Sequence, residues 1–420
     1  MQLLGQLLTH LLVVRIIGVG ADTDAYIAAQ AVPSVLGAIV ITALQSVWLP
    51  RLAVLSGDMV AWRHEQSIAQ GQGGILGGGL LLLFGVTITW WLPLLYAGFT
   101  VQQQQTTIEL CLVMLVGAGF NTQSALLTIA LRARDRFVSA EWISLVGILF
   151  SIIAMYIALP IWGLAAAVWI SLLRAIVVYL ALMHLASWPP LSFIKGWFCN
   201  ETWILMRPLL FGVSIYKTSS LVDRYWASQA PAGAITILSL AQTGMGALAT
   251  ILERAICMPI TPILARHVAQ SDYAGLRRAY RSGILRVTIV VVCFGVLLIV
   301  LKPMFVEVIA TAFNIQAETA TILWLMCLIL MGYLHAAAAG AIVIQAFYAM
   351  GNTKTPVKIG FAGFLLSLGV KAIGYLWFGL LGLALGTTIY YSLNMLVMWI
   401  ILESTINNKG RIQARSARNK

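Results

Sequence analysis

A stripe of charged residues interrupts an otherwise apolar segment near residues 208–228. In the run VSIYKTSSLVDRYWASQ, Lys217 and Arg224 are seven residues apart and share one helix face, and Asp223 lies one step round. Charged side chains are costly inside a bilayer, so this face must meet a wet cavity or charged partners rather than lipid. The cations suit an anionic or polar substrate. The alternative is a structural ion-pair network that holds a helix bundle together.

Further ionisable residues interrupt other apolar segments. They are Arg15, Arg174, Glu253, Arg254, His335 and Lys371. Most are compatible with a place in a substrate cavity and equally with anchoring at the membrane surface, where long side chains extend their charge into water. His335 lies in an alanine-rich run, which is compatible with a proton relay or with a packed, hydrogen-bonded histidine.

The composition is that of a membrane protein. Hydrophobic residues make up 60% of the 420 residues, charged residues 10%, and the mean hydropathy is +0.92. A soluble domain carries roughly a quarter charged residues. The apolar runs are long enough to cross a bilayer. We expect an all-α integral membrane protein of about twelve transmembrane helices. They are expected near residues 2–19, 25–55, 73–95, 107–131, 138–159, 163–186, 208–228, 234–266, 284–309, 321–350, 357–378 and 381–402.

Basic residues gather in alternate loops. They occur at 51–64, 132–136, 195–207, 266–286, 354–358 and 409–420. The intervening loops carry almost none, with Lys302 as the exception. This pattern predicts that both termini are cytosolic and that the helix count is even. It also accounts for the net charge of +12 without a nucleic-acid partner. The polar segment 271–283 is expected to lie along the cytosolic interface as an amphipathic stretch.

The two halves of the chain resemble each other weakly. When AAQAVPSVLGAIVITALQSVWLPRLAVLSGD is aligned with LAQTGMGALATILERAICMPITPILARHVAQSD, Gln30 falls on Gln242 and Pro50 on Pro262. We therefore expect two parallel six-helix lobes, at 1–190 and 206–404, related by a pseudo-two-fold axis along the membrane normal. A cytosolic linker at 191–205 would join them, and a basic cytosolic tail would follow at 405–420. Such repeats are typical of alternating-access transporters.

No cofactor or metal site is indicated. The five cysteines are scattered without a CxxC pair, so they are interpreted as membrane filler. A transporter of this type needs at most a coupling ion, H⁺ or Na⁺. Membrane lipid is an expected partner, and a monomer is the expected state.

Four stretches resemble the MviN/MurJ family of lipid II flippases. They are RIIGVGADTDAYIAAQAVP, VDRYWASQAPAGAITILSLAQ, LERAICMPITPILARH and QAFYAMGNTKTPVKIG. This family belongs to a larger group of exporters that includes MATE transporters and O-antigen flippases. The resemblance implies a V-shaped bundle of two six-helix lobes. It also implies movement of a lipid-linked sugar from the inner to the outer leaflet of the bacterial cytoplasmic membrane, without enzymatic chemistry.

The resemblance assigns several residues. Asp24 matches the family's aspartate after helix one. Asp223 falls on a position that binds sodium in some members, and Lys371 falls at or near a position that is often asparagine. If Lys371 faces Asp223, its ammonium takes the place of a bound cation and sodium is not needed. Three positions where lipid II flippases have cavity arginines are Thr9, Gly37 and Thr243.

Four functions are compatible with these residues. The first is a flippase for a polyprenyl diphosphate sugar or for a peptidoglycan or polysaccharide precursor. Its substrate cavity would include Arg15, Asp24, Arg174, Lys217, Asp223 and Arg224. The second is an ion-coupled exporter of small molecules, with Asp223 and His335 as proton carriers. A non-transporting family paralogue and a membrane glycosyltransferase are the others. The glycosyltransferase is disfavoured because the outer loops are short, with only Glu307 and Glu318 in the longest of them.

Overall fold

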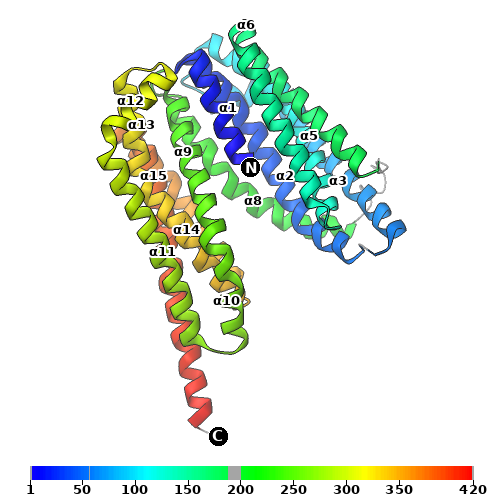
Figure 1. Cartoon of the computed structure of the whole chain (residues 1–420), viewed down its shortest axis with the longest axis vertical. Helices are drawn as coiled ribbons and strands as arrows, with labels where there is room; N and C mark the ends of the chain where they lie inside the picture. The colour runs from blue at the N-terminus through cyan, green and yellow to red at the C-terminus, as the bar shows by residue number, and fades with distance from the viewer. Residues whose placement is uncertain (1, 56, 188–199, 419–420) are drawn as a thin grey trace. The chain divides into compact units, whose positions relative to one another are not determined.

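The structure, a computed structural model, describes residues 2–55, 57–187 and 200–418, and their regular structure is entirely helical (Figure 1). The chain divides into two compact units, Met1–Thr236 and Ile237–Lys420, which we describe one at a time. Residues 191–199 of the expected linker lie outside the described residues, and residues 200–205 already belong to a helix. The predicted lobe boundaries stay a prediction.

The described residues of the first unit form seven helices of different lengths. They are α1 (Gln2–Ile17), α2 (Ala21–Val54), α3 (Met59–Val86), α4 (Ile88–Leu95), α5 (Val101–Arg132), α6 (Phe137–Leu185) and α8 (Asn200–Ala227). Helix α2 packs against both α5 and α8. The core near one end of α2 is built on Trp48 and Trp62, which are fully buried.

The second unit begins within α9 and continues to the end of the chain. Its helices are α9 (Ala234–Leu252), a π-helical turn (Glu253–Cys257), α10 (Met258–Ala269), α11 (Tyr273–Val300), α12 (Lys302–Phe313), α13 (Ala317–Ile329), α14 (Met331–Ala349) and α15 (Lys354–Arg418). In the π-helical turn the N–H of Met258 bonds to the carbonyl of Glu253. The next residue, Pro259, has no N–H to donate, which favours such an irregular turn.

Helices α6 and α15 are each helical hairpins that reverse at one glycine. Gly163 in α6 and Gly379 in α15 have positive φ angles of 59° and 55°. In α15 the two arms touch, because a Cβ added to Gly382 would lie 1.8 Å from the carbonyl oxygen of Gly374. Only glycine allows this backbone approach.

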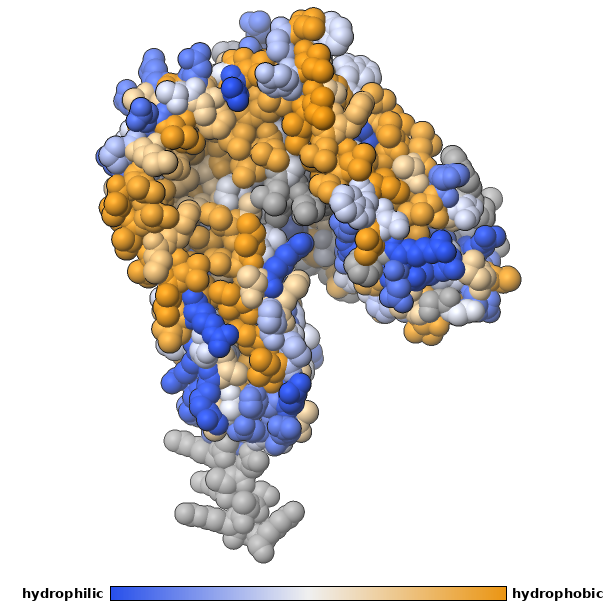
Figure 2. Space-filling view, viewed as in Figure 1, coloured by the Kyte–Doolittle hydropathy of each residue, from blue (hydrophilic) through white to orange (hydrophobic). Residues whose placement is uncertain are grey.

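Counting both arms of each hairpin, the described residues form twelve spans, which confirms the predicted fold class. Eight of the helices are long and apolar enough to cross a membrane by length and composition. Their outer faces are apolar: Figure 2 shows hydrophobic side chains over the flank of α11 and hydrophilic ones near the turn between α10 and α11. Exposed apolar faces of this kind are expected where lipid replaces water.

Polar caps set where several helices begin. The side chain of Asp58 accepts from the N–H groups of Val60 and Ala61 at the start of α3. At the start of α11, Asp272 accepts from the N–H of Gly275 at 2.8 Å. Such caps satisfy N–H groups that have no partner inside the helix.

The two halves follow the same plan. The caps Asp58 and Asp272 correspond, as do the left-handed glycines Gly18 and Gly233, with φ of 94° and 92°. The hairpin glycines of α6 and α15 are a third pair. Each half also has a short helix after its third long helix, α4 in the first and α12 in the second.

One expectation about the second half was wrong. The segment 271–283 does not form a separate interfacial stretch, because residues from Tyr273 onward are the first turns of α11. This end of α11 is instead fixed to α15. The carboxylate of Glu403 pairs with Arg277 at 3.0 Å and with Arg281 at 2.6 Å. These ion pairs partly neutralise the basic residues whose polarity suggested that the segment lies along the membrane interface.

Candidate functional site

The charged end of α8 lies against α2 in the first unit. The guanidinium of Arg224 lies 3.4 Å from the carbonyl oxygen of Ile27, a long hydrogen bond. The hydroxyl of Tyr96 donates to the neighbouring carbonyl of Ala28 at 2.9 Å. Arg224 interacts electrostatically with Tyr96 and with the adjacent Asp223, which is only 3% exposed. A cation and two polar groups therefore meet at one turn of α2.

A histidine of α1 belongs to the same site. His10 is 2% exposed, and its Nε2 lies 2.6 Å from the side-chain oxygen of Gln30 on α2. Its Nδ1 has no hydrogen-bond partner among the described residues. Arg224 is close enough to interact electrostatically with the ring. Sequence reasoning missed His10, although an ionisable residue inside an apolar helix is a signal in itself.

Arg174 lies on α6 and faces another residue of α2. It interacts electrostatically with Tyr26, whose hydroxyl also hydrogen-bonds to Ser171. Tyr26 is 1% exposed. The first unit thus holds two partly buried arginines, Arg174 and Arg224, both directed at the same stretch of α2.

Asp24, at the start of α2, is fully engaged. One carboxylate oxygen accepts from the N–H of Gly233 at 2.7 Å, and the other accepts from the N–H and hydroxyl of Thr236 at 2.8 and 2.6 Å. These donors belong to the first turn of α9 and the residue before it. Asp24 therefore stabilises a helix N-terminus, where a negative charge is favoured.

The loops beside Asp24 pack closely against one another. A Cβ on Gly98 would lie 2.1 Å from the carbonyl oxygen of Ser228, and one on Gly233 would lie 2.5 Å from a methyl group of Val19. The connections after α1, α4 and α8 therefore converge in the first unit. Glycine is required wherever two backbones approach this closely.

Other predicted site residues lie apart from this cluster or in the second unit. Arg15 is exposed, and Lys217 is half-buried two turns before Arg224 on α8. In the second unit, Lys371 is 2% exposed and packs beneath Gly386 in the α15 hairpin. His335 lies 2.9 Å from the hydroxyl of Thr288 on α11. Their roles in substrate binding or ion coupling stay predictions.

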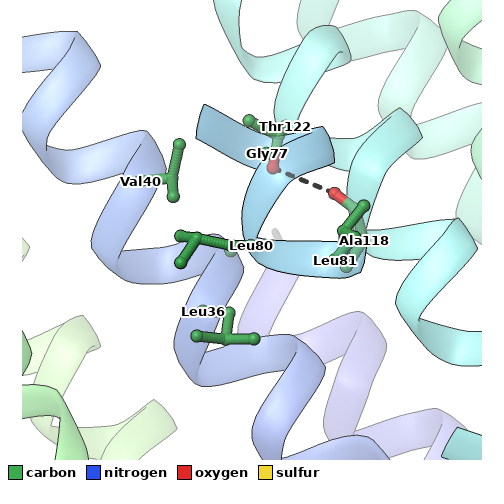
Figure 3. Close-up of a pocket in the computed structure, with 8 residues that line it drawn as sticks. Leu36, Val40, Gly77, Leu80, Leu81, Ala118 and Thr122 are labelled. Carbon is green, nitrogen blue, oxygen red and sulfur yellow. Dashed lines mark hydrogen bonds between the residues drawn. The ribbon is translucent and has the colours of Figure 1, made fainter. Parts of the chain in front are cut away.

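The positions that the family resemblance assigns to cavity arginines carry uncharged residues here. Figure 3 shows a small apolar pocket between α2, α3 and α5, whose lining includes Gly37, Leu36 and Leu80. Nothing lies within 4 Å of a Cβ placed on Gly37. The hydroxyl of Thr9 bonds to its own helix, at the carbonyl of Gly5. Neither Gly37 nor Thr9 supplies a cation.

The part of the chain that the structure describes contains no candidate metal site. No group of three or more His, Cys, Asp or Glu side chains there could hold a metal ion. Several of the ionisable groups inside the spans are held by groups on neighbouring helices, as His10, Arg224 and His335 are. The fold and this distribution of charge define a polytopic helical membrane protein of the transporter type.

A sequence model of a protein family matches nearly the whole chain. The model described as "Lipid II flippase MurJ" matches residues 13–415, so this chain belongs to the MurJ family. This confirms the resemblance found in the four sequence stretches.

Two curated relatives are described as probable lipid II flippases MurJ. The protein from Vibrio cholerae is 25% identical over 207 residues, which cover 46% of this chain and 37% of the relative. The protein from Haemophilus influenzae is 26% identical over 213 residues, which cover 46% of this chain and 39% of the relative. The matched region is thus well under two thirds of each relative.

Two solved structures share the fold over nearly the whole chain. An inward closed lipid II flippase MurJ has a TM-score of 0.82 at 16% identity, covering 96% of this chain and 85% of that one. An inward-facing MATE-family multidrug resistance transporter has a TM-score of 0.80 at 15% identity, covering 98% and 96%. At these identities the likeness concerns the fold.

Proposed function

We propose that this protein is a flippase for a lipid-linked sugar, a peptidoglycan or polysaccharide precursor on a polyprenyl diphosphate. The observation that carries the proposal is membership of the MurJ family over residues 13–415. Alternating access across the bacterial cytoplasmic membrane, with both termini cytosolic, is the mode of action we infer. Transport of this kind changes no covalent bond and needs no cofactor beyond a coupling ion, H⁺ or Na⁺. A monomer suffices for it.

The diphosphate needs fixed cations. The three positions that the family resemblance assigns to cavity arginines do not provide them. Thr9, Gly37 and Thr243 are neutral. Arginine binds phosphate oxygens well because its five N–H donors form a planar fork. Arg224 has one long hydrogen bond of 3.4 Å, which leaves donors for a ligand. We assign the diphosphate to Arg224, with Lys217 on the same helix face and Arg174 as further cations.

A second function is favoured by a different pair of observations. The fold is also that of a MATE-family transporter, and Asp223 is a buried carboxylate beside the site. A buried carboxylate suits a cationic substrate or a coupling proton. In this alternative the protein exports small molecules in exchange for an ion.

Two substitutions separate these functions. The purified protein is reconstituted in vesicles, and movement of a fluorescent polyprenyl diphosphate sugar is measured together with efflux of an organic cation. Arg224→Ala should abolish lipid flipping, and Asp223→Asn should leave most of it. Loss of cation efflux in Asp223→Asn, with no flipping by the wild type, would support the exporter instead. Lys354→Gln, at the first residue of α15, is the matched control for removing one positive charge.

A further inference from the structure

An open apolar groove lies between the short helices α12 and α13 of the second unit. Its volume is about 610 Å³, within the usual range for a small-molecule site. Pro303, Val306 and Ala310 line it from α12, and Ala317 and Thr321 line it from α13. These helices lie at the end of the second unit opposite the C-terminus (Figure 1). None of the residues proposed for diphosphate binding contributes to the groove.

Two opposite charges border this apolar lining. Lys302 and Glu307 both line the groove, five residues apart on α12. No ion pair joins either of them to another of the described residues. The groove therefore offers one cation, one carboxylate and an apolar floor.

The ammonium of Lys302 is held in a defined place. It lies 4.8 Å from the centre of the Trp324 ring, a cation–π contact. The indole is fixed in turn, because its N–H donates to the carbonyl of Leu298 at 2.8 Å. Lys302 is also the first residue of a twelve-residue helix, so its charge lies at the N-terminal end of that helix, where the helix dipole is positive. This end of the groove is therefore preorganised for an anion.

The corresponding helix of the first half lacks this feature. Helix α4 also follows the third long helix, and the indole N–H of its own Trp91 donates to the carbonyl of Phe84 on α3. Its first residue is Ile88, where α12 has Lys302. Lys302 is also the basic residue that departs from the charge pattern of the loops, on the side predicted to be outer. The cation is thus an addition to the second half rather than part of the shared plan.

The surroundings of α12 indicate what reaches the groove. Met304 and Val308 on this helix are 60% and 50% exposed. Large apolar side chains that are this exposed suit the acyl region or the headgroup boundary of a bilayer. The occupant is therefore an amphiphile of the membrane itself rather than a soluble anion.

We propose that the α12–α13 groove binds one outer-leaflet phospholipid whose headgroup carries both a phosphate and a primary ammonium. Its phosphate lies at Lys302 and the first turn of α12, its ammonium at Glu307, and an acyl chain along the apolar lining. Phosphatidylethanolamine has this chemistry. A phosphatidylglycerol lacks the ammonium, and the quaternary ammonium of a phosphatidylcholine has no N–H to donate to Glu307.

The test uses the full-length protein in vesicles of equal parts phosphatidylethanolamine, phosphatidylglycerol and phosphatidylcholine. The protein is extracted mildly, and the lipids that remain bound are counted by native mass spectrometry. Wild type should retain phosphatidylethanolamine over the others. Lys302→Gln should weaken retention of both phosphatidylethanolamine and phosphatidylglycerol by about fivefold. Glu307→Gln should weaken phosphatidylethanolamine alone and remove its advantage over phosphatidylglycerol.

Controls separate the groove from general effects of charge. Lys354→Gln and Glu318→Gln remove the same charges outside the lining and should leave retention unchanged. Ala310→Trp fills the groove, keeps both charges and should lower retention of all three lipids. Equal retention of the three lipids by wild type would overturn the proposal. So would Lys302→Gln and Glu307→Gln variants that match their controls. Displacement of the bound phospholipid by added polyprenyl diphosphate would assign the groove to the transported substrate instead, which also overturns it.

Discussion

The carboxylate of Asp24 accepts two hydrogen bonds from Thr236, one from its N–H at 2.8 Å and one from its hydroxyl at 2.6 Å. With the third bond from Gly233, an aspartate at the start of α2 caps the first turn of α9. Asp24 is 3% exposed, so water does not compete for these bonds. Asp24, which the family resemblance singles out, therefore fixes the position of the start of α9 through these hydrogen bonds.

Asp24→Asn should destabilise the protein. The amide keeps the shape but loses the charge, and it turns one acceptor oxygen into a donor that faces N–H groups. We expect a loss of about 1.5–3 kcal/mol, the range for hydrogen bonds to a charged group. Thermal unfolding in detergent measures it. Asp22→Asn is the matched control, because Asp22 lies in the same first turn and is exposed. Equal unfolding temperatures for the two variants would contradict this role.

Gly98→Ala should disturb the junction of the loops. Its Cβ would lie 2.1 Å from the carbonyl oxygen of Ser228, so one backbone segment must move. We expect a lower unfolding temperature and slower transport. Gly78→Ala should be neutral or slightly stabilising, since nothing lies within 4 Å of its Cβ and alanine favours a helix by about 1 kcal/mol. Matching unfolding temperatures for the two variants would show that the loops do not pack as described.

Lys371 should make transport independent of sodium. The family resemblance implies that, if Lys371 faces Asp223, its ammonium takes the place of a bound cation. Each of the two side chains is buried within its own unit. Flipping by the wild type should be the same in sodium and in potassium buffers, while Lys371→Ala should become slower or acquire a sodium requirement. Strong sodium dependence in the wild type that persists in Lys371→Ala would refute the idea.

The turn between α10 and α11 should weaken in acid. The N–H of Gly275 bonds to Asp272, and this bond, helped by His267, holds the pKa of the carboxyl below its usual value. Because the pKa of Asp272 is lower in the folded protein than in the unfolded chain, its contribution to the stability of this turn is complete above the pKa of an unfolded aspartate. It is lost as the pH falls through the folded value. In hydrogen-exchange measurements, the first turn of α11 should therefore open more often only at acid pH, where Asp272 is protonated. Asp272→Asn should show faster exchange already at neutral pH, and unchanged exchange would contradict the cap.

The fold could be predicted from the sequence because lipid imposes simple rules. Long apolar runs and alternating basic loops were enough for twelve spans. The hairpin glycine Gly379 falls in an expected loop, and Gly163 directly follows one. The first turns of α11 were misassigned, because Arg277 and Arg281 resemble an interfacial stretch until Glu403 is seen to pair with them. That partner lies more than a hundred residues away, so local patterns do not reveal it.

The candidate site was predicted only in part. Asp24, Arg174 and Arg224 stand out in sequence as charges in or beside apolar helices. In the structure Arg174 and Arg224 contact residues of α2, while Asp24, itself on α2, caps the start of α9. Which groups they bond to depends on how α8 and α6 pack, and periodicity alone does not fix that. His10 was overlooked because it counts as neutral, although its burial and short contact with Gln30 mark it clearly.

The central claim is that Arg224 binds the diphosphate of a lipid-linked sugar during flipping. Vesicles containing the wild type, Arg224→Ala or Arg224→Lys should be compared for flipping of a fluorescent polyprenyl diphosphate sugar. Wild type should flip it, Arg224→Ala should fall to the rate of empty vesicles, and Arg224→Lys should recover part of the rate because it restores charge without the planar fork. Flipping by Arg224→Ala at the wild-type rate would contradict the account.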